Sequence, residues 1–199
     1  MTQITLDGVP FPFAPDGPEP ASWTSSPDQV TIAAGAGTDL FVDPAGSAQS
    51  PDAFRLLGEP PAGDYQLSAK VEVGFHATFD AGVLLVHADE RHWAKLCCEF
   101  TPQGEPSIVS VVTRGESDDA NSFDLDAPAS WLRVTRTGEA HAFHASEDGV
   151  YWRLIRYFAL GVPARVGFLS QSPTGKGCTS VFSDIRFTPS APKDLRDGT

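Results

Sequence analysis

The chain is short of positive charge. It has 14 Lys and Arg residues against 26 Asp and Glu residues, which gives a formal net charge of −12 over 199 residues. No basic stripe offsets this excess, and so acidic a chain repels phosphate backbones and anionic lipid headgroups. We therefore expect neither nucleic acid nor a membrane surface as a partner.

Signals for export and for membrane insertion are also missing. The N-terminus has no basic segment followed by an apolar one, as a secretory signal peptide requires. The longest apolar run, 83–86, is far too short to cross a bilayer. The three cysteines are an odd number, and Cys97 and Cys98 are neighbours that would point to opposite faces of a strand, while Cys178 stands alone. These features predict a cytoplasmic protein with unpaired thiols.

Helical periodicity is absent too. No stretch repeats its apolar residues every 3.6 positions, so we expect at most a helical turn or two. Instead, about twelve strand-like runs alternate with Gly, Pro and Asp turns, among them 38–43 and 65–73. Asp148-Gly149 between Phe143 and Tyr151 is a strong hairpin signal. The pattern predicts an all-β fold, a jelly-roll β-sandwich of two antiparallel sheets.

Composition divides the chain into three parts. Residues 1–28 are rich in proline, which removes ladder donors, so we expect an N-terminal arm that packs on the body as an extended edge. Residues 29–188 form a single jelly-roll domain, because nothing in them resembles a linker. The polar residues 189–199 are expected to be a flexible tail.

The run 92–100 carries the main candidate site. Alternation places Trp93, Lys95 and Glu99 on one face, and the apolar residues between them on the other. A Trp that offers apolar area beside charged groups suits a polar ligand such as a sugar. Arg133 and Trp152 are the next candidates for ligand contacts. The alternative is a polar layer that only faces solvent.

Catalytic and metal-binding motifs are few. Candidates for acid/base chemistry are Glu99, Lys95 and His87, the last because an imidazole titrates near neutral pH. Glu99 has no second glutamate at the spacing that a retaining glucanase needs on one strand. No histidines have zinc-ligand spacing, and the acidic segment 115–126 fits a solvated loop better than a calcium site. We expect no metal and no cofactor.

Several segments together resemble a known family. They are Asp80-Ala-Gly-Val-Leu-Leu-Val, Trp93-Ala-Lys95, Trp131-Leu-Arg-Val, Ser146-Glu-Asp-Gly and Val166-Gly-Phe. They are similar to the YesU-like family, which also contains the yeast protein named for regulation of enolase. The resemblance implies a concanavalin A-like jelly roll with one concave sheet, as in lectins, glucanases and accessory domains of xylosidases. The family commonly has an aromatic residue after Ser117-Asp118, and here Phe123 is the possible substitute.

Three functions stay open at this point. The first is a non-catalytic jelly roll that binds a carbohydrate or a small metabolite on an aromatic and charged concave face. The second is a small-molecule enzyme that uses acid/base residues on the same face, which a pocket with a strongly shifted carboxyl pKa would favour. The third is a protein-interaction or regulatory module, which a large exposed apolar patch would favour. The lack of a second glutamate at glucanase spacing makes the enzyme hypothesis less favoured than binding. The sequence does not indicate an oligomeric state.

Overall fold

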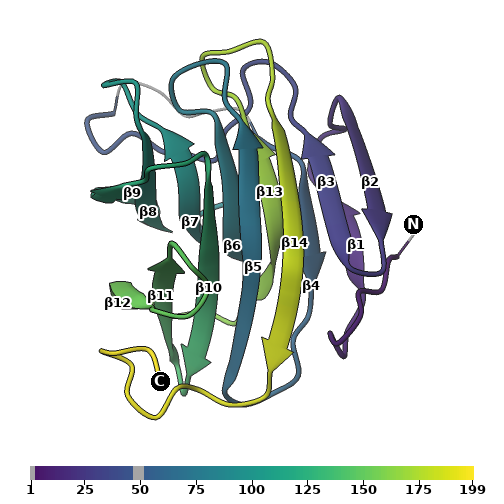
Figure 1. Cartoon of the computed structure of the whole chain (residues 1–199), viewed down its shortest axis with the longest axis vertical. Coiled ribbons are helices and arrows are strands. Elements are labelled where there is room, and N and C mark those ends of the chain that lie inside the picture. Colours follow the sequence, from purple (N-terminus) through teal and green to yellow (C-terminus); the bar gives the residue numbers. More distant parts are fainter. Residues whose placement is uncertain (1–2, 47–51) are drawn as a thin grey trace.

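Fourteen strands form two antiparallel sheets of seven strands each in this computed structural model, which describes residues 3–46 and 52–199 (Figure 1). The first sheet has the order β1-β4-β13-β6-β7-β8-β9, and the second has the order β12-β11-β10-β5-β14-β3-β2. The described residues contain no helix. They therefore also contain no helix that could cross a membrane. The prediction of a two-sheet, jelly-roll β-sandwich is confirmed.

The strands of the first sheet are β1 (Phe13–Asp16), β4 (Arg55–Gly58), β13 (Arg165–Gln171), β6 (Ala81–Asp89), β7 (His92–Phe100), β8 (Pro106–Arg114) and β9 (Glu116–Asp124). Those of the second sheet are β12 (Arg153–Ala159), β11 (Ala140–Ser146), β10 (Ala129–Thr137), β5 (Tyr65–Gly74), β14 (Thr179–Thr188), β3 (Gln29–Ala33) and β2 (Ser22–Ser26).

The main core lies between the two sheets. On β5 the alternating residues from Tyr65 to Val73 are buried, because period-2 geometry turns every second side chain inward. Leu96 of β7 and Phe168 of β13 meet them from the first sheet, both fully buried. Burial of this much apolar surface is the main force that holds the sandwich together.

The two ends of the chain lie against the sandwich. The Pro-rich arm supplies an edge strand to each sheet, β1 to the first and β2 to the second, where a missing N–H costs no ladder bond. The tail 189–199 lies along the outer face of the second sheet, near β12 (Figure 1). Its Gly198 carbonyl accepts a hydrogen bond from Arg133 at 2.9 Å, and its Leu195 carbonyl lies 2.8 Å from Nε2 of His144.

A second apolar cluster lies on the outer face of the first sheet, which is the face turned away from the main core. Val83, Leu85 and Leu169 form part of its floor, and Leu40 packs on them from the long connection between β3 and β4, residues 34–54. Of this connection, residues 47–51 lie outside the described structure. The outer face of the first sheet is therefore a second buried layer rather than a solvated surface.

Two local expectations were wrong. The run 38–43 was expected to be a strand, but it pairs only at single points, such as Thr38 with Ser172, and lies across the outer face as part of the connection. The segment 115–126 was expected to be a loop, but most of it is the edge strand β9. Acidic side chains on this edge discourage pairing with other chains, which explains a composition that looked like a loop.

Candidate functional site

Strand β7 carries the predicted site residues to the outer face of the first sheet. Trp93, Lys95, Cys97 and Glu99 are all buried there, while Leu96 points to the main core. The alternation read from the sequence is therefore the one that the structure has.

Cross-strand register brings further polar residues to the same place. Lys95 lies opposite Val111, whose other neighbour is Asp119. On the other side, Glu99 lies opposite Ala81, and Ala81 lies opposite Gln171. These residues line a pocket of about 160 Å³, which we call the Glu99 pocket: Asp39, Phe41, Phe79, Lys95, Glu99, Val111, Asp119 and Gln171.

Lys95 is the fixed positive charge of the Glu99 pocket. Its ammonium group donates to Oδ1 of Asp39 at 2.8 Å and to Oε1 of Gln171 at 3.0 Å. Burial acts to lower the pKa of Lys95, but the surrounding acidic groups, Asp39 first among them, together raise the pKa above its usual value. Lys95 is thus a charged hydrogen-bond donor. It is a poor candidate for a general base, because it is protonated and already bonded to Asp39 and Gln171.

Glu99 has the opposite surroundings. Within the described residues its carboxyl group makes no hydrogen bond, and the residue is 9% exposed. Burial raises the pKa of Glu99 to about 8, although Lys95 opposes the shift. Burial also raises the pKa of the neighbouring Asp119. At neutral pH the pocket therefore presents a protonated carboxyl group that can donate as well as accept.

Two aromatic rings complete the lining of this pocket. Phe79 is 38% exposed and has a φ of 70°, which is unusual for a bulky residue. Its carbonyl accepts a long bond of 3.4 Å from Nε2 of Gln171. Strained backbone of this kind persists where the surrounding structure holds it, and it is common beside binding sites. Phe41 is half-buried and comes from the connection.

A second pocket of about 250 Å³ lies on the same face, and we call it the Trp93 pocket. It is lined by Leu40, Phe41, Val42, Asp52, Arg55, His87, Glu90 and Trp93. Burial, assisted by Arg55, lowers the pKa of His87 to about 4, so its imidazole is neutral. His87, a candidate for acid/base chemistry, lies directly opposite Trp93 and is buried.

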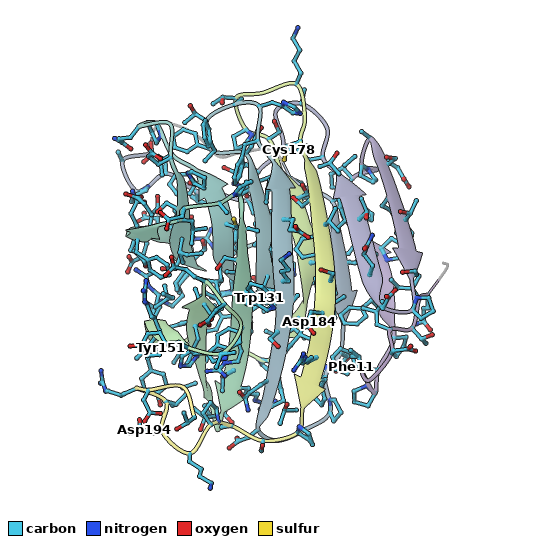
Figure 2. The ribbon with its side chains drawn as sticks, in the orientation of Figure 1. Phe11, Trp131, Tyr151, Cys178, Asp184 and Asp194 are labelled. Carbon is cyan, nitrogen blue, oxygen red and sulfur yellow. The ribbon has the colours of Figure 1, made fainter. Side chains whose placement is uncertain are left out.

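The structure does not bring Arg133 and Trp152 to this face. They lie on the outer face of the second sheet, where the Arg133 guanidinium stacks over the Trp152 ring at 4.3 Å beneath the tail. On the same sheet, Nε1 of Trp131 donates to Asp184 at 3.0 Å (Figure 2). Burial lowers the pKa of Arg133 to about 10. The candidate residues therefore divide between two opposite faces of the molecule.

Other residues differ from expectation in their surroundings. Phe123, the possible aromatic substitute, packs against the main core under Arg153, and it lines neither pocket. Asp39, Phe41 and Phe79 line the Glu99 pocket but were not singled out from the sequence, because they lie in connections whose position over β7 the sequence pattern does not give. Among the residues that the structure describes, no group of three or more His, Cys, Asp or Glu is arranged to hold a metal ion.

A family model described as "Protein of unknown function (DUF1349)" matches residues 18–190. The chain belongs to the DUF1349 family. Among curated proteins, none matches this DUF1349 chain.

Solved structures share the fold of this DUF1349 protein at low sequence identity. A functionally unknown protein from Saccharomyces cerevisiae is 22% identical with a TM-score of 0.82, over 90% of this chain and 97% of the yeast chain. The GH43 BlXynB protein from Bacillus licheniformis is 14% identical with a TM-score of 0.70, over 90% of this chain but only 36% of its own. The alginate lyase from Klebsiella pneumoniae is 12% identical with a TM-score of 0.55, over 85% and 84% of the two chains. The chain is thus similar in fold to about a third of the GH43 protein and to most of the lyase.

Proposed function

We propose that this DUF1349 protein binds a carbohydrate, or a small metabolite as rich in hydroxyl groups, in the Glu99 pocket without transforming it. The observation that carries the proposal is the buried carboxyl group of Glu99, which faces a pocket without a protein partner. Aromatic rings that cover the apolar side of a ligand, with a few polar groups that fix its orientation, are typical of small-molecule sites. Phe41 and Phe79 supply the rings, and Lys95 and Gln171 supply fixed polar groups.

The charges of the pocket favour a neutral ligand. Lys95 and Asp39 form an ion pair at 2.8 Å, so their charges largely cancel. Glu99 is protonated at neutral pH because its pKa is about 8. An anionic ligand would also meet a chain with a net charge of −12. A sugar without a carboxylate or phosphate group fits these conditions best.

The fold neighbours support the ligand class. One is a GH43 glycoside hydrolase, another is a xylan beta-1,4-xylosidase from Bacillus halodurans, and a third is an alginate lyase, so each is named for action on a carbohydrate. Their identities are far too low to carry over residue roles. They support the choice of sugars as the first ligands to test.

A second candidate is a small-molecule enzyme with Glu99 as general acid. The observation in its favour is the pKa of about 8, because a general acid works best when its pKa is near the working pH. Asp119 adds a second carboxyl group to the same pocket from a different strand. Because Asp119 and Glu99 lie on different strands, the spacing of glutamates along one strand does not indicate this pair. Lys95 is held in an ion pair and His87 lies in the other pocket, so this mechanism would depend on the two carboxyl groups.

Two finer points belong to the same proposal. The first is that this DUF1349 chain is related to the YesU-like proteins, which the sequence resembles. That relationship implies a jelly roll with a concave binding face. A cytoplasmic location agrees with three buried free cysteines, since reducing compartments keep thiols unpaired.

Calorimetric titration with a panel of neutral sugars tests the proposed function. The panel is xylose, arabinose, glucose, mannose, xylobiose, cellobiose and mannobiose. We expect at least one of them to bind, Glu99→Ala to weaken that binding about tenfold or more, and Glu99→Gln to keep most of it, because an amide replaces a protonated acid closely. Glu105→Ala is the matched control, since Glu105 is exposed in the turn after β7.

The outcomes separate the two candidates. If no sugar of the panel binds, the proposed function fails. If the wild type converts a bound sugar into products by chromatography and Glu99→Gln does not, the protein is an enzyme and the non-catalytic function is wrong.

A further inference from the structure

The two pockets on the outer face of the first sheet are neighbours along one strand. Trp93, which lines one pocket, precedes Lys95 and Glu99 of the other by two and six residues on β7. At the usual rise per strand residue, this offsets them by roughly 7 to 20 Å. Phe41 lines both pockets, so it is the residue that they share.

The residues on both sides of Phe41 are anchored to the sheet. On one side, Asp39 accepts from Lys95 at 2.8 Å. On the other side, the Val42 amide donates to Oγ of Ser117 at 2.9 Å, and the Val42 carbonyl accepts from the Ser117 amide at 2.9 Å. Phe41 is therefore held in place next to both pockets.

The Trp93 pocket contains polar atoms without partners. Among the described residues, Nε of Arg55, Nδ1 of His87 and Nε1 of Trp93 are buried and make no hydrogen bond. All three side chains line the pocket, and the residues are only 7%, 5% and 4% exposed. Native proteins rarely leave buried polar atoms unpaired, and the residues that carry these three all line one hollow, so a bound group or water is the partner that they lack.

The charges of the Trp93 pocket do not select an anion. The Arg55 guanidinium is paired with Asp16 at 2.6 Å and also with Asp52. The imidazole of His87 is neutral, since its pKa is about 4. Leu40 and Val42 add apolar side chains to the lining. The lining matches a neutral ring that has both hydroxyl groups and an apolar face.

We propose that the Glu99 and Trp93 pockets are adjacent subsites for one neutral oligosaccharide of at least two sugar units, with Phe41 between the units. This inference rests on the proposed function, and it narrows the ligand from a single sugar or metabolite to a short chain of sugars. The Glu99 pocket holds one unit through Glu99, Lys95 and Gln171. The Trp93 pocket holds the next unit through the indole and imidazole nitrogens.

Titration of matched sugar pairs tests the inference: xylose with xylobiose, glucose with cellobiose, and mannose with mannobiose. For at least one pair we expect the disaccharide to bind about tenfold or more tightly than the monosaccharide. Trp93→Phe keeps an aromatic face but removes the indole donor, and Val42→Phe fills the pocket from a half-buried position on the connection. Each variant should reduce the advantage of the disaccharide to about threefold or less and leave monosaccharide affinity unchanged. Glu99→Ala should weaken both members of the pair.

Three results would overturn the inference. Equal affinity for both members of every pair would show that one subsite is enough. Trp93→Phe and Val42→Phe could instead weaken the monosaccharide and the disaccharide by the same factor. That result would show that the Trp93 pocket does not bind a second sugar unit. If no sugar of either length binds, the proposed function fails and the subsites fail with it. Thermal unfolding checks that each variant is folded, and Val42→Phe carries the test if Trp93→Phe is not.

Discussion

Glu99 is a buried carboxyl group that the protein keeps without a hydrogen-bond partner among its described residues. Such a group destabilises the fold when it is ionised, because the low-dielectric surroundings do not solvate a negative charge. Lys95, on the same strand face, reduces that cost but is already bonded to Asp39 and Gln171. A residue that costs stability and lies in a pocket is better explained by binding than by folding.

The raised pKa of Glu99 predicts a particular dependence of stability on pH. The folded pKa is about 8 and the ordinary value is 4.5, so the folded state binds more protons than the unfolded state between these values. The free energy of unfolding contributed by Glu99 should therefore fall as pH rises from about 5 to 8. Glu99→Gln should remove this fall and be more stable than the wild type at pH 8 by about 1–3 kcal/mol, with little difference at pH 5.

Urea unfolding of both proteins from pH 5 to 9 measures the effect. Burial lowers the pKa values of His87, His141 and His144 to about 4, and these residues change stability in the opposite direction as pH rises to about 6.5. The difference between wild type and Glu99→Gln removes their contribution, since both proteins contain them. A difference that stays constant across the pH range would show that Glu99 is ionised in the folded state.

The side chains of one strand could be predicted better than their partners. Alternation alone assigns Trp93, Lys95 and Glu99 to one face, and the structure has them there. It cannot say which strand of the chain lies beside them, so Asp119 and Gln171 needed the observed register. For the same reason, outward-facing residues of the other sheet, such as Arg133, cannot be told from residues of this one.

The connection between β3 and β4 shows a related limit. Its apolar residues Leu40 and Val42 alternate with others as in a strand, because they pack on the outer face of the first sheet. The backbone of this connection pairs with the rest of the protein only at a few points. A strand-like alternation of apolar residues therefore belongs here to a segment that covers the sheet and is not itself a strand of it. Periodicity reports which side chains are buried, and it does not report whether the backbone has a neighbour.

The ion pair between Asp39 and Lys95 should contribute strongly to holding the connection on the sheet. Lys95 is 2% exposed and the Asp39 side chain is 13% exposed. Removing one partner of a buried pair leaves the other charge without compensation, so Lys95→Met should lower the free energy of unfolding by about 3–5 kcal/mol. A double-mutant cycle with Asp39→Asn should give a coupling energy of about 1 kcal/mol or more.

Lys70 and Glu72 provide the matched control. They also form an ion pair, at 3.1 Å, but their side chains are 29% and 49% exposed. Lys70→Met should cost about 1 kcal/mol or less, because solvent screens such a pair. Equal costs at Lys70 and Lys95 in urea unfolding would mean that the connection is held by its apolar contacts and not by the ion pair.

Taken together, the molecule has two buried layers that share the first sheet. One is the main core between the sheets, and the other lies beneath the connection, where both pockets open. The adjacent residues Cys97 and Cys98 lie in different layers, because neighbouring side chains of a strand point to opposite faces. Cys98 is buried in the main core and Cys97 in the second cluster. Cys178 also belongs to the main core, so the three thiols together lie in both buried layers of the molecule.

The reactivity of these thiols should therefore report global unfolding. Burial raises the pKa of Cys98 to about 12 and that of Cys178 to about 11, and it raises the pKa of Cys97 as well. Since only the thiolate reacts, a thiol reagent should label none of them within minutes in buffer and all three in urea above the unfolding midpoint. Mass measurement without reductant should show three free thiols, and single Cys→Ser variants assign each labelling rate. Early labelling of Cys97 alone would show that the connection opens while the sandwich stays folded, whereas a bridged pair would overturn the expectation of unpaired thiols.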